Sequence, residues 1–245
     1  MEDSRVARLR GMDSAAPGRP AVSPATAPWV IPVTLAGRRV RLEPLERTHV
    51  PGLLAAGADP ATWTWMHAPL TDEAAMRAWV DDALRARDAG AEVPFATVDA
   101  TTGRILGSTR FMSIAPAHRR LEIGWTWLAP AAQGTGANTE AKQLMLEHAF
   151  ERLGAMRVEL KTDARNERSR AALAGIGARF EGVFRRHQLM ADGRVRDSAW
   201  YAVTDEDWPA VREQLWARLA AQAGPAPEEE HRRFARRCSR CPPTS

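Results

Sequence analysis

The stretch that decides the fold reads Leu121-Glu-Ile-Gly-Trp-Thr-Trp-Leu-Ala-Pro-Ala-Ala-Gln-Gly-Thr-Gly-Ala-Asn-Thr-Glu-Ala141. It predicts a strand that ends in a turn with two glycines, from which a helix begins. Glycine permits a positive φ and lets a ligand approach the backbone closely. The first turn of a helix offers free N–H groups and a partial positive charge. The segment can therefore bind a phosphate group without any lysine.

Two glycines alone leave a second interpretation open, a plain strand-to-helix turn that needs glycine only for its geometry. The turn is not a P-loop, because no Gly-Lys-Ser/Thr follows. Nor is it a GxGxxG fingerprint, because Gly136 is followed by Ala137, Asn138 and Thr139. The chemistry of the turn has to be judged from its surroundings.

Strands and helices are expected on both sides of this turn. Alternating apolar residues predict strands at 39–44, 94–99, 104–114, 119–128, 157–163, 179–190 and 196–203. Helical periodicity and capping residues predict helices at 48–58, 71–89, 135–153, 166–175 and 205–221. Thr48 and Asn166 are the expected N-caps of two of them. On helix 135–153 we expect Glu140 on an exposed acidic stripe and His148 on the packed side.

This order predicts a mixed α/β domain whose seven-stranded sheet is mostly antiparallel, because consecutive strands favour a meander. One strand–helix–strand unit, 119–163, favours a single parallel pair. The ordered domain is expected at 29–222. Residues 1–28 and 223–245 are rich in Pro, Ala, Gly, Ser and charged residues and are expected to be disordered tails. Cys238 and Cys241 lie in the second tail and are not expected to form a redox or zinc site.

The basic charge does not point to nucleic acid. Of the 34 basic residues only Lys142 and Lys161 are lysines, and the net charge is +4. The two expected tails carry +1 and +2 of it, which leaves about +1 for the domain. A nucleic-acid binder should concentrate positive charge on its folded surface. No apolar run is long enough to span a bilayer, and no apolar signal segment opens the chain. A cytoplasmic protein without a membrane partner is expected.

Gln133-Gly-Thr-Gly-Ala-Asn138 resembles the Q/R-x-x-G-x-G/A signature of the GNAT superfamily of acyl-CoA N-acyltransferases. Glu122-Ile-Gly-Trp-Thr-Trp-Leu128 and Asn138-Thr-Glu-Ala-Lys142 resemble the branch that contains ribosomal-protein N-terminal acetyltransferases. The element order from 33 to 203 is similar to that fold as well. The chain departs from the signature at Asn138, where the family has Gly or Ala. Asn tolerates unusual backbone angles better than most residues.

The resemblance implies a GNAT-like sheet with a splayed parallel pair, and acetyl-CoA as co-substrate without a metal. The pyrophosphate would lie on Gln133, Gly134, Thr135, Gly136, Ala137 and Asn138, and the acyl end beside the backbone of Trp127 and Leu128. A second segment, Asp163-Ala-Arg-Asn-Glu-Arg-Ser169, resembles the family's Asn-x-x-Ser motif. It implies that Asn166 contacts the pantetheine arm and that Ser169 lies near the thioester sulfur. A helix cap and a solvent-facing hydroxyl are the alternatives.

A base must remove a proton from the attacking amine, and a carboxylate acting through water is common for this task. Glu122 is the best candidate, because Leu121 and Ile123 point to the other face of the strand. The alternative is an ion pair with Arg119 or Arg120. The leaving thiolate must also be stabilised, and the resemblance implies a tyrosine for this role in many members of the superfamily. The one tyrosine of this chain, Tyr201, lies on the last expected strand, away from the Asn166 segment, so Ser169 is the candidate. Main-chain N–H groups near 126–128 are expected to hold the oxyanion.

The acceptor should be a primary amine, either a protein N-terminus or a small molecule, and the sequence does not separate these. Trp63, Trp65 and Trp125 are candidates for an aromatic acceptor wall, with core packing as the alternative. A monomer or homodimer is expected. A non-catalytic acyl-CoA-binding module is the rival function. Such a module would not need Glu122 and Ser169, so the presence of both residues favours an enzyme.

Overall fold

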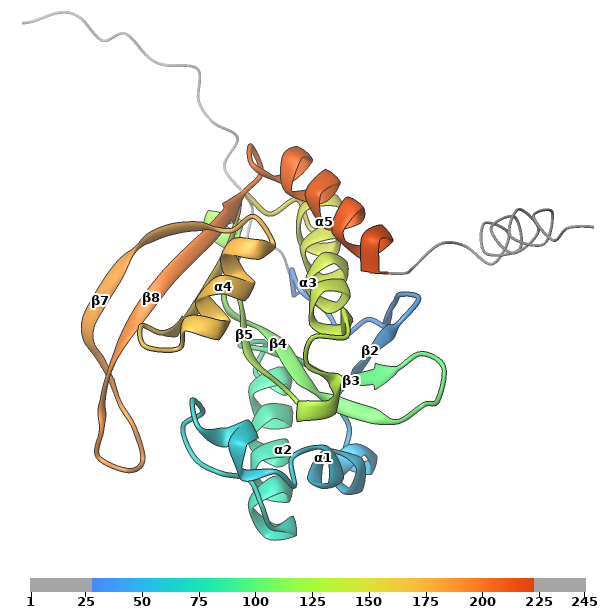
Figure 1. Cartoon of the computed structure of the whole chain (residues 1–245), viewed down its shortest axis with the longest axis vertical. Helices are drawn as coiled ribbons and strands as arrows, with labels where there is room; N and C mark the ends of the chain where they lie inside the picture. The colour runs from blue at the N-terminus through green and yellow to red at the C-terminus, as the bar shows by residue number, and fades with distance from the viewer. Residues whose placement is uncertain (1–27, 223–245) are drawn as a thin grey trace, which may run out of the picture.

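The computed structural model describes residues 28–222 as one eight-stranded sheet with helices on both faces. Figure 1 follows the chain from blue to red through these layers. The predicted tails, with Cys238 and Cys241, lie outside the described residues except for Pro28. Among the described residues no helix has the length and apolar character to cross a membrane.

The sheet order is β1-β2-β3-β4-β5-β6-β8-β7. The strands are β1 Leu35–Ala36, β2 Val40–Pro44, β3 Val93–Asp99, β4 Ile105–Ala115, β5 Arg120–Leu128, β6 Arg157–Asp163, β7 Arg179–Leu189 and β8 Val195–Thr204. Within residues 28–222 only β5 and β6 pair in parallel, so the predicted mostly antiparallel sheet with one parallel pair is confirmed. The eighth strand is β1, whose two residues are too short to produce an alternating pattern.

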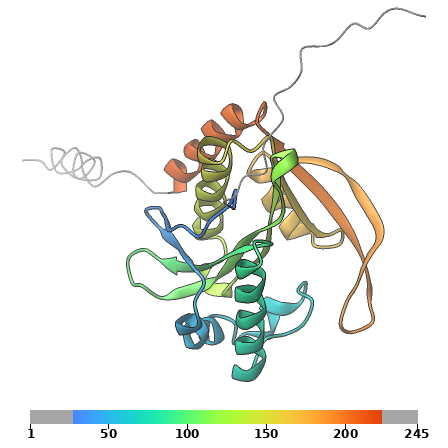
Figure 2. The ribbon, with the colours of Figure 1, turned by 180° about the vertical axis from the view of Figure 1, so that it is seen from behind.

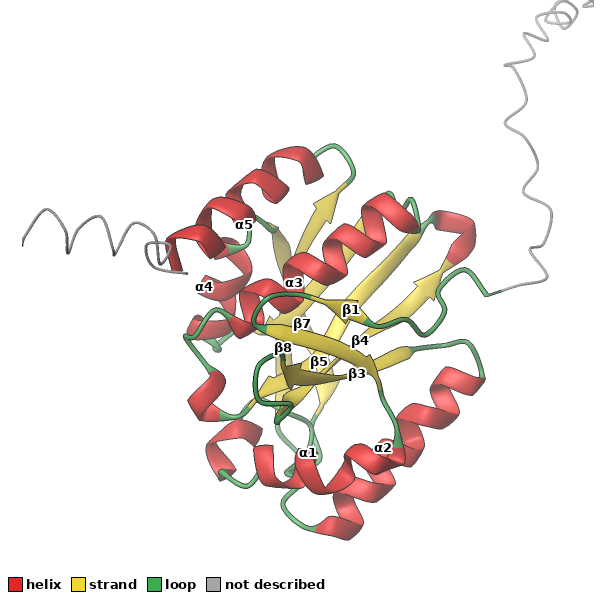
Figure 3. Cartoon of the chain, turned by 90° about the vertical axis from the view of Figure 1, so that its right-hand side faces the viewer, coloured by secondary structure: helices red, strands yellow, loops and turns green. Residues whose placement is uncertain are grey.

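The helices cover the two faces of the sheet separately (Figures 2 and 3). Helices α1 Val50–Ala56 and α2 Glu73–Asp88 pack on one face, around a buried cluster that includes Leu53, Met76 and Trp127. Helices α3 Ala137–Glu147, α4 Glu167–Gly175 and α5 Trp208–Gln222 pack on the other, around the larger cluster that includes Phe111, Met145 and Leu215. We call these the α1/α2 face and the α3 face.

Two local expectations are wrong. Thr48 does not cap α1, because a short 3₁₀ turn over Arg47–His49 precedes it and His49 takes the N-cap position. Glu140 is not exposed: its carboxylate is buried and accepts hydrogen bonds from the backbone N–H groups of Arg38, Arg39 and Val40 at 3.1, 2.6 and 2.8 Å. Helical spacing alone cannot reveal that the β1–β2 turn needs an acceptor at this point.

The parallel pair opens like a V. The β5–β6 ladder contains only Arg120–Arg157, Leu121–Val158 and Glu122–Glu159. Beyond Glu122 the two strands no longer pair, although β5 continues to Leu128 and β6 to Asp163. A bulge lies in the unpaired part of β5, where Trp125 and Thr126 stand opposite Thr109 and Trp125 adopts a φ of 49°. The bulge bends β5 away from β6, and Glu122 lies at the apex of the V.

Candidate active site

The Gln133–Asn138 turn follows the open end of β5 and begins α3. Gly134 and Gly136 have φ values of 80° and 92°, in the left-handed region where glycine avoids the strain of a side chain. A Cβ atom at Gly134 would meet nothing within 4 Å. The space beside this backbone is therefore open to a ligand, while the backbone itself needs glycine.

The turn also has unused donors. Within residues 28–222 the N–H groups of Gly134, Thr135 and Gly136 donate to no acceptor. The Thr135 hydroxyl donates to the Ala132 carbonyl at 2.8 Å, which fixes the turn. The Asn138 Oδ1 atom is buried and accepts no hydrogen bond from the described residues. Three free N–H groups at a helix N-terminus form an arrangement that binds an anion.

The other arm of the V carries Asn166 and Ser169. Asn166 caps α4, because its Oδ1 accepts from the backbone N–H of Ser169 at 3.0 Å. The cap interpretation of Asn166 thus has direct geometric support, and the contact with a cofactor remains a proposal. The Ser169 hydroxyl forms no hydrogen bond with the described residues and is half-buried.

A contact joins the two arms. The Arg168 guanidinium on α4 donates to Gln133 Oε1, and Gln133 Nε2 donates to the Leu128 carbonyl at 2.9 Å. Gln133 thus connects the end of β5 to the start of α4 across the V. The side chains of Trp127 and Leu128 are buried in the core, so only their backbone is available at the splay.

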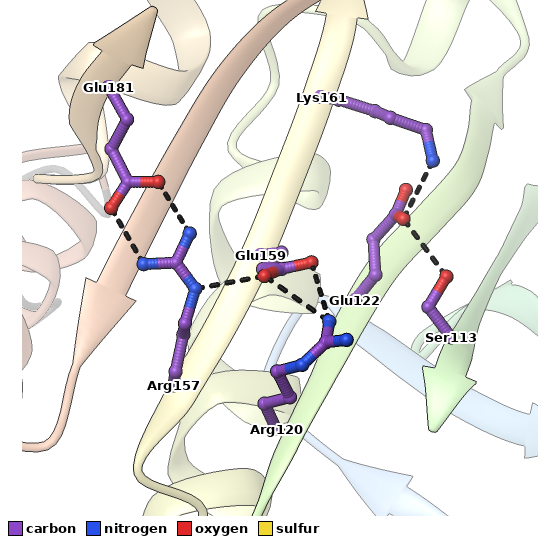
Figure 4. Close-up of polar contacts among 7 residues, drawn as sticks. All are labelled: Ser113, Arg120, Glu122, Arg157, Glu159, Lys161 and Glu181. Carbon is purple, nitrogen blue, oxygen red and sulfur yellow. Dashed lines mark hydrogen bonds and ion pairs between the residues drawn. The ribbon is translucent and has the colours of Figure 1, made fainter. Parts of the chain in front are cut away.

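Glu122 is 1% exposed and does not pair with an arginine. Its Oε2 accepts from Lys161 Nζ at 2.7 Å and from the Ser113 hydroxyl at 3.3 Å (Figure 4). Its Oε1 accepts no hydrogen bond from the described residues. A Cβ atom at the neighbouring Gly124 would lie 3.0 Å from Oε1. The atom nearest to such a Cβ would be Met112 Sδ at 2.5 Å, so glycine at this position leaves room for both the methionine and the carboxylate.

The expected arginine partners have other contacts. Arg120 pairs with Glu159 at 3.3 Å, and the Arg119 guanidinium donates to the Gly154 carbonyl. Glu159 also pairs with Arg157 at 2.9 Å (Figure 4). Glu159 and Glu122 are register partners across the parallel pair, but two arginines hold the former and one lysine the latter. This pair offers a matched comparison of two carboxylates.

The three tryptophans proposed for the acceptor wall have different environments. Trp63 is buried, donates to the Gly57 carbonyl at 2.8 Å and packs against Trp127 at 4.8 Å. Its burial favours the core-packing alternative for Trp63. Trp65 is half-buried, with the guanidinium carbons of Arg165 and Arg194 at 5.8 and 5.9 Å from its ring centroid. Both Trp65 and Trp125 remain candidates.

Trp125 sits in the bulge, also half-buried. Its ring lies 5.0 Å from the Arg110 guanidinium carbon and 5.5 Å from the His67 ring. Residues from the α1–α2 connection thus approach the bulge on the α1/α2 face. His148, in contrast, stacks on Phe111 at 6.2 Å in the α3 layer, as the packing interpretation predicts.

Lys142 was not predicted as a site residue, although it is one of only two lysines in the chain. It is 4% exposed, and its Nζ lies 2.6 Å from the Thr126 hydroxyl in the bulge and 3.4 Å from that of Thr109. Burial lowers its pKa to about 7, against the opposing effect of the Glu122 charge. The second lysine is Lys161, so both lysines meet this region. That rarity was the signal available in the sequence.

The comparisons with known proteins agree with this geometry. A family model described as an acetyltransferase (GNAT) domain matches residues 39–179. A GCN5-related N-acetyltransferase structure from Brucella melitensis is 34% identical, with a TM-score of 0.73 over 82% of this chain and 89% of that one. RimJ of Mycobacterium smegmatis, solved in complex with CoA-disulfide, shares the fold at 24% identity and a TM-score of 0.68, over 76% of this chain and 94% of RimJ.

Among curated relatives, YdaF of Bacillus subtilis carries the provisional name of a ribosomal N-acetyltransferase. It is 31% identical over 106 residues, which are 43% of this chain and 57% of YdaF. The match therefore spans just over half of that relative. The family model covers more than half of the chain, and the splayed sheet and the glycine turn agree with it. The chain therefore belongs to the GNAT acetyltransferase family and is similar to its ribosomal-protein N-acetyltransferase branch.

Proposed function

We propose that the protein transfers an acetyl group from acetyl-CoA to a primary amine by direct attack. The observation that carries this proposal is the combination of the open V with the free N–H groups of Gly134, Thr135 and Gly136. The CoA pyrophosphate would accept from these groups, and the pantetheine arm would enter the V between β5 and α4. The charge of a diphosphate suits a helix N-terminus. Acetyl-CoA as donor makes the cytoplasm the expected site of reaction.

Glu122 is the proposed base. The amine nitrogen attacks the thioester carbonyl, a C–N bond forms, and the C–S bond breaks. Glu122 Oε1 takes the proton that the nitrogen must lose, directly or through one water. Lys161 and Ser113 hold Oε2 and so fix the orientation of the carboxylate. Its position at the apex of the V fits this role.

Ser169 is the proposed donor to the leaving thiolate, which must end as a free thiol. Its backbone N–H is committed to the Asn166 cap, so the hydroxyl is the part available for chemistry. The developing oxyanion would be held by main-chain N–H groups of β5 near Thr126–Leu128, beside the bulge. No step in this scheme calls for a metal.

The acceptor we favour is a protein N-terminus, because relatives such as YdaF are named for ribosomal N-acetylation. A small-molecule amine is the second candidate. A monomer is sufficient for the scheme, since all proposed groups come from one chain, and a homodimer would not alter it.

An acceptor screen tests the proposal. The full chain is incubated with acetyl-CoA and panels of N-terminal peptides and small amines, while free thiol release and product mass are followed. Acetylation of an amine together with stoichiometric thiol release is the expected result. Tight CoA binding with no turnover of any amine would favour the non-catalytic binding module instead.

A further inference from the structure

Arg196 on β8 is a buried cation without a counter-ion among the described residues. Its exposed fraction is 8%, its Nε donates to no acceptor, and it forms no ion pair within residues 28–222. Burying a charge is costly unless it is paired and hydrogen-bonded. A guanidinium held in this way is suited to an anion that arrives from solution, because the guanidinium fork matches a carboxylate.

The nearby acids are already occupied. Asp163 accepts from Arg165 at 3.1 Å and from Arg194 at 3.2 Å. Glu122 is paired with Lys161 at 2.7 Å. These two carboxylates are also the ones whose negative charges act on Arg196. Each has its own cationic partner, so Arg196 is the cation in excess.

The strand pattern puts Arg196 on the acceptor side. Along β8, Ala199 and Tyr201 pack into the core of the α3 face, so Arg196, Ser198 and Trp200 point to the α1/α2 face. Lys161, which holds the proposed base, pairs in register with Trp200, and its Nζ lies 5.1 Å from that ring. The Gln133–Asn138 turn, in contrast, begins a helix of the opposite face, so Arg196 is not placed for the CoA pyrophosphate.

The surroundings of Arg196 carry further unused polar atoms. Among the described residues, the buried Oε1 of Gln188, its register partner on β7, and the buried Nε1 of Trp200 lack a hydrogen-bond partner at normal distance and angle. The Gln188 side chain is nevertheless close enough to His67 to raise the pKa of that ring, against the effect of burial. His187 Nδ1 lies 3.0 Å from the Ser198 hydroxyl. Burial lowers the pKa values of His187 and His67, and the Arg196 charge lowers both further. A lowered pKa disfavours the protonated form of both rings, so they add little positive charge beside Lys161 and Arg196.

We propose that Arg196 binds a carboxylate carried by the acceptor, so that the substrate class is an amine that also bears a carboxylate. This inference rests on the proposed function. The carboxylate could be the α-carboxylate of a free amino acid or an acidic side chain close to a peptide N-terminus. An amine without a carboxylate would bring only positive charge to a face that already holds an unpaired guanidinium. The carboxylate would supply the missing counter-ion and orient the amine toward Glu122.

The first experiment compares acceptors that differ only in charge. Acceptor kcat/KM is measured for alanine against alaninamide, and for an Ala-Asp peptide against Ala-Asn, each with an amidated C-terminus. The proteins are wild type, Arg196→Met and Arg185→Met, the last an exposed arginine on the same hairpin. In at least one pair wild type should prefer the carboxylate by about 10-fold or more. Arg196→Met should lose the preference and Arg185→Met should keep it. The pair that responds identifies the source of the carboxylate.

A second measurement does not depend on turnover. N-acetylalanine and N-acetylalaninamide are titrated into the same three proteins while the NMR signals of the His67 and His187 rings are followed. Saturable shifts with the carboxylate alone, absent in Arg196→Met, are the expected result. Such binding without acetylation of any amine would retain the anion site and reject the proposed function. Equal responses to acid and amide in wild type, or a preference that survives in a folded Arg196→Met, would overturn the inference.

Folding of the variant is checked by melting. Removing an unpaired buried charge should leave the melting temperature unchanged or raise it. A large loss of stability in Arg196→Met, with no acid preference in wild type, would mean that the arginine has a structural partner and would also overturn the inference. An Arg196→Lys variant, which keeps the charge but lacks the planar fork, should retain part of the acid preference.

Discussion

The turn proposed for the cofactor and the side chains of the α1/α2 face proposed for the acceptor, here called the acceptor face, are built in opposite ways. The turn is six consecutive residues, Gln133–Asn138, and it offers backbone N–H groups whose positions follow from two glycines and a helix start. The acceptor face is assembled from side chains on β5, β6, β7, β8 and the α1–α2 connection. Glu122, Lys161 and Arg196 lie far apart in the chain, and the sheet places their strands, β5, β6 and β8, side by side.

This difference determines what each region can tolerate. A backbone site depends on glycine and on local geometry, so few substitutions remove it. The acceptor face depends on the balance of charge between Glu122 and the cations Lys161 and Arg196. A substitution that alters one of these charges therefore alters the environment of the others. Single substitutions on the acceptor face should therefore affect catalysis, whereas those in the turn should affect affinity for CoA.

Glu122→Gln should give the largest effect. Because an amide cannot accept the proton, kcat/KM for amine acetylation should fall by roughly 10²–10⁴-fold, with acetyl-CoA affinity little changed. The matched control is Glu159→Gln, its register partner, which pairs with Arg120 and Arg157. The control should lower the melting temperature and leave kcat nearly unaffected. Equal losses of kcat in the two variants would reduce Glu122 to a structural ion pair.

Ser169→Ala should have a smaller effect, confined to turnover. A hydrogen bond to a developing thiolate contributes about 1.5–3 kcal/mol, so kcat should fall by roughly 10–100-fold. The KM for acetyl-CoA should stay nearly constant, because alanine keeps the N–H that Asn166 caps. Asn166→Ala provides the comparison: loss of the cap should loosen the start of α4 at a cost of about 1 kcal/mol in stability. An unchanged kcat in Ser169→Ala would assign the hydroxyl to solvent.

Lys142→Met should have the smallest effect, and it concerns stability. The pKa of Lys142 is lowered from 10.5 to about 7 in the folded chain. Between these values the unfolded chain binds the extra proton, so wild-type stability rises with pH there. The cost of the buried charge is complete below pH 7. Methionine should therefore raise the melting temperature by a few degrees at pH 6.

At pH 9 the folded lysine is largely neutral, so the gain from Lys142→Met should shrink. Thermal melts at the two pH values measure this difference. A gain that does not depend on pH would mean that packing, and not charge, is what the substitution changes. Either outcome leaves the proposal for Arg196 unchanged, because Lys142 belongs to α3 on the opposite face of the sheet, although it contacts Thr126 in the bulge.

The sequence predicted the parts that are local. Alternation gave seven of the eight strands, and Gly134, Gly136 and Asn166 indicated the turn and the cap from neighbouring residues alone. It failed where a side chain finds a distant partner. Glu140 binds the β1–β2 turn about 100 residues away, and Glu122 pairs with Lys161 across the V, not with the adjacent arginines. Trp63 is buried in the core, whereas Trp65, two residues later, is half-buried. Such outcomes depend on register and packing, which periodicity does not encode.

The proposed contact between the pyrophosphate and the turn is tested most directly by shortening the ligand and substituting the turn in the same experiment. Calorimetry gives the affinities for CoA and for pantetheine, which lacks the pyrophosphate and the adenosine 3′-phosphate attached to it. The proteins are wild type, Gly134→Val and Gly90→Val. Gly90 lies two residues after the end of α2, and like Gly134 it has a positive φ, 72° against 80°, and open space where a Cβ would stand. Backbone strain from valine should therefore be similar at the two sites.

Wild type and Gly90→Val should bind CoA about 100-fold or more tightly than pantetheine, because the pyrophosphate accepts from the free N–H groups of the turn. In Gly134→Val the branched side chain would occupy the space beside the turn, and the preference for CoA over pantetheine should fall by about 10-fold or more. A Gly134→Val protein that is folded and keeps the full preference for CoA would contradict the account, since the pyrophosphate would then be held elsewhere.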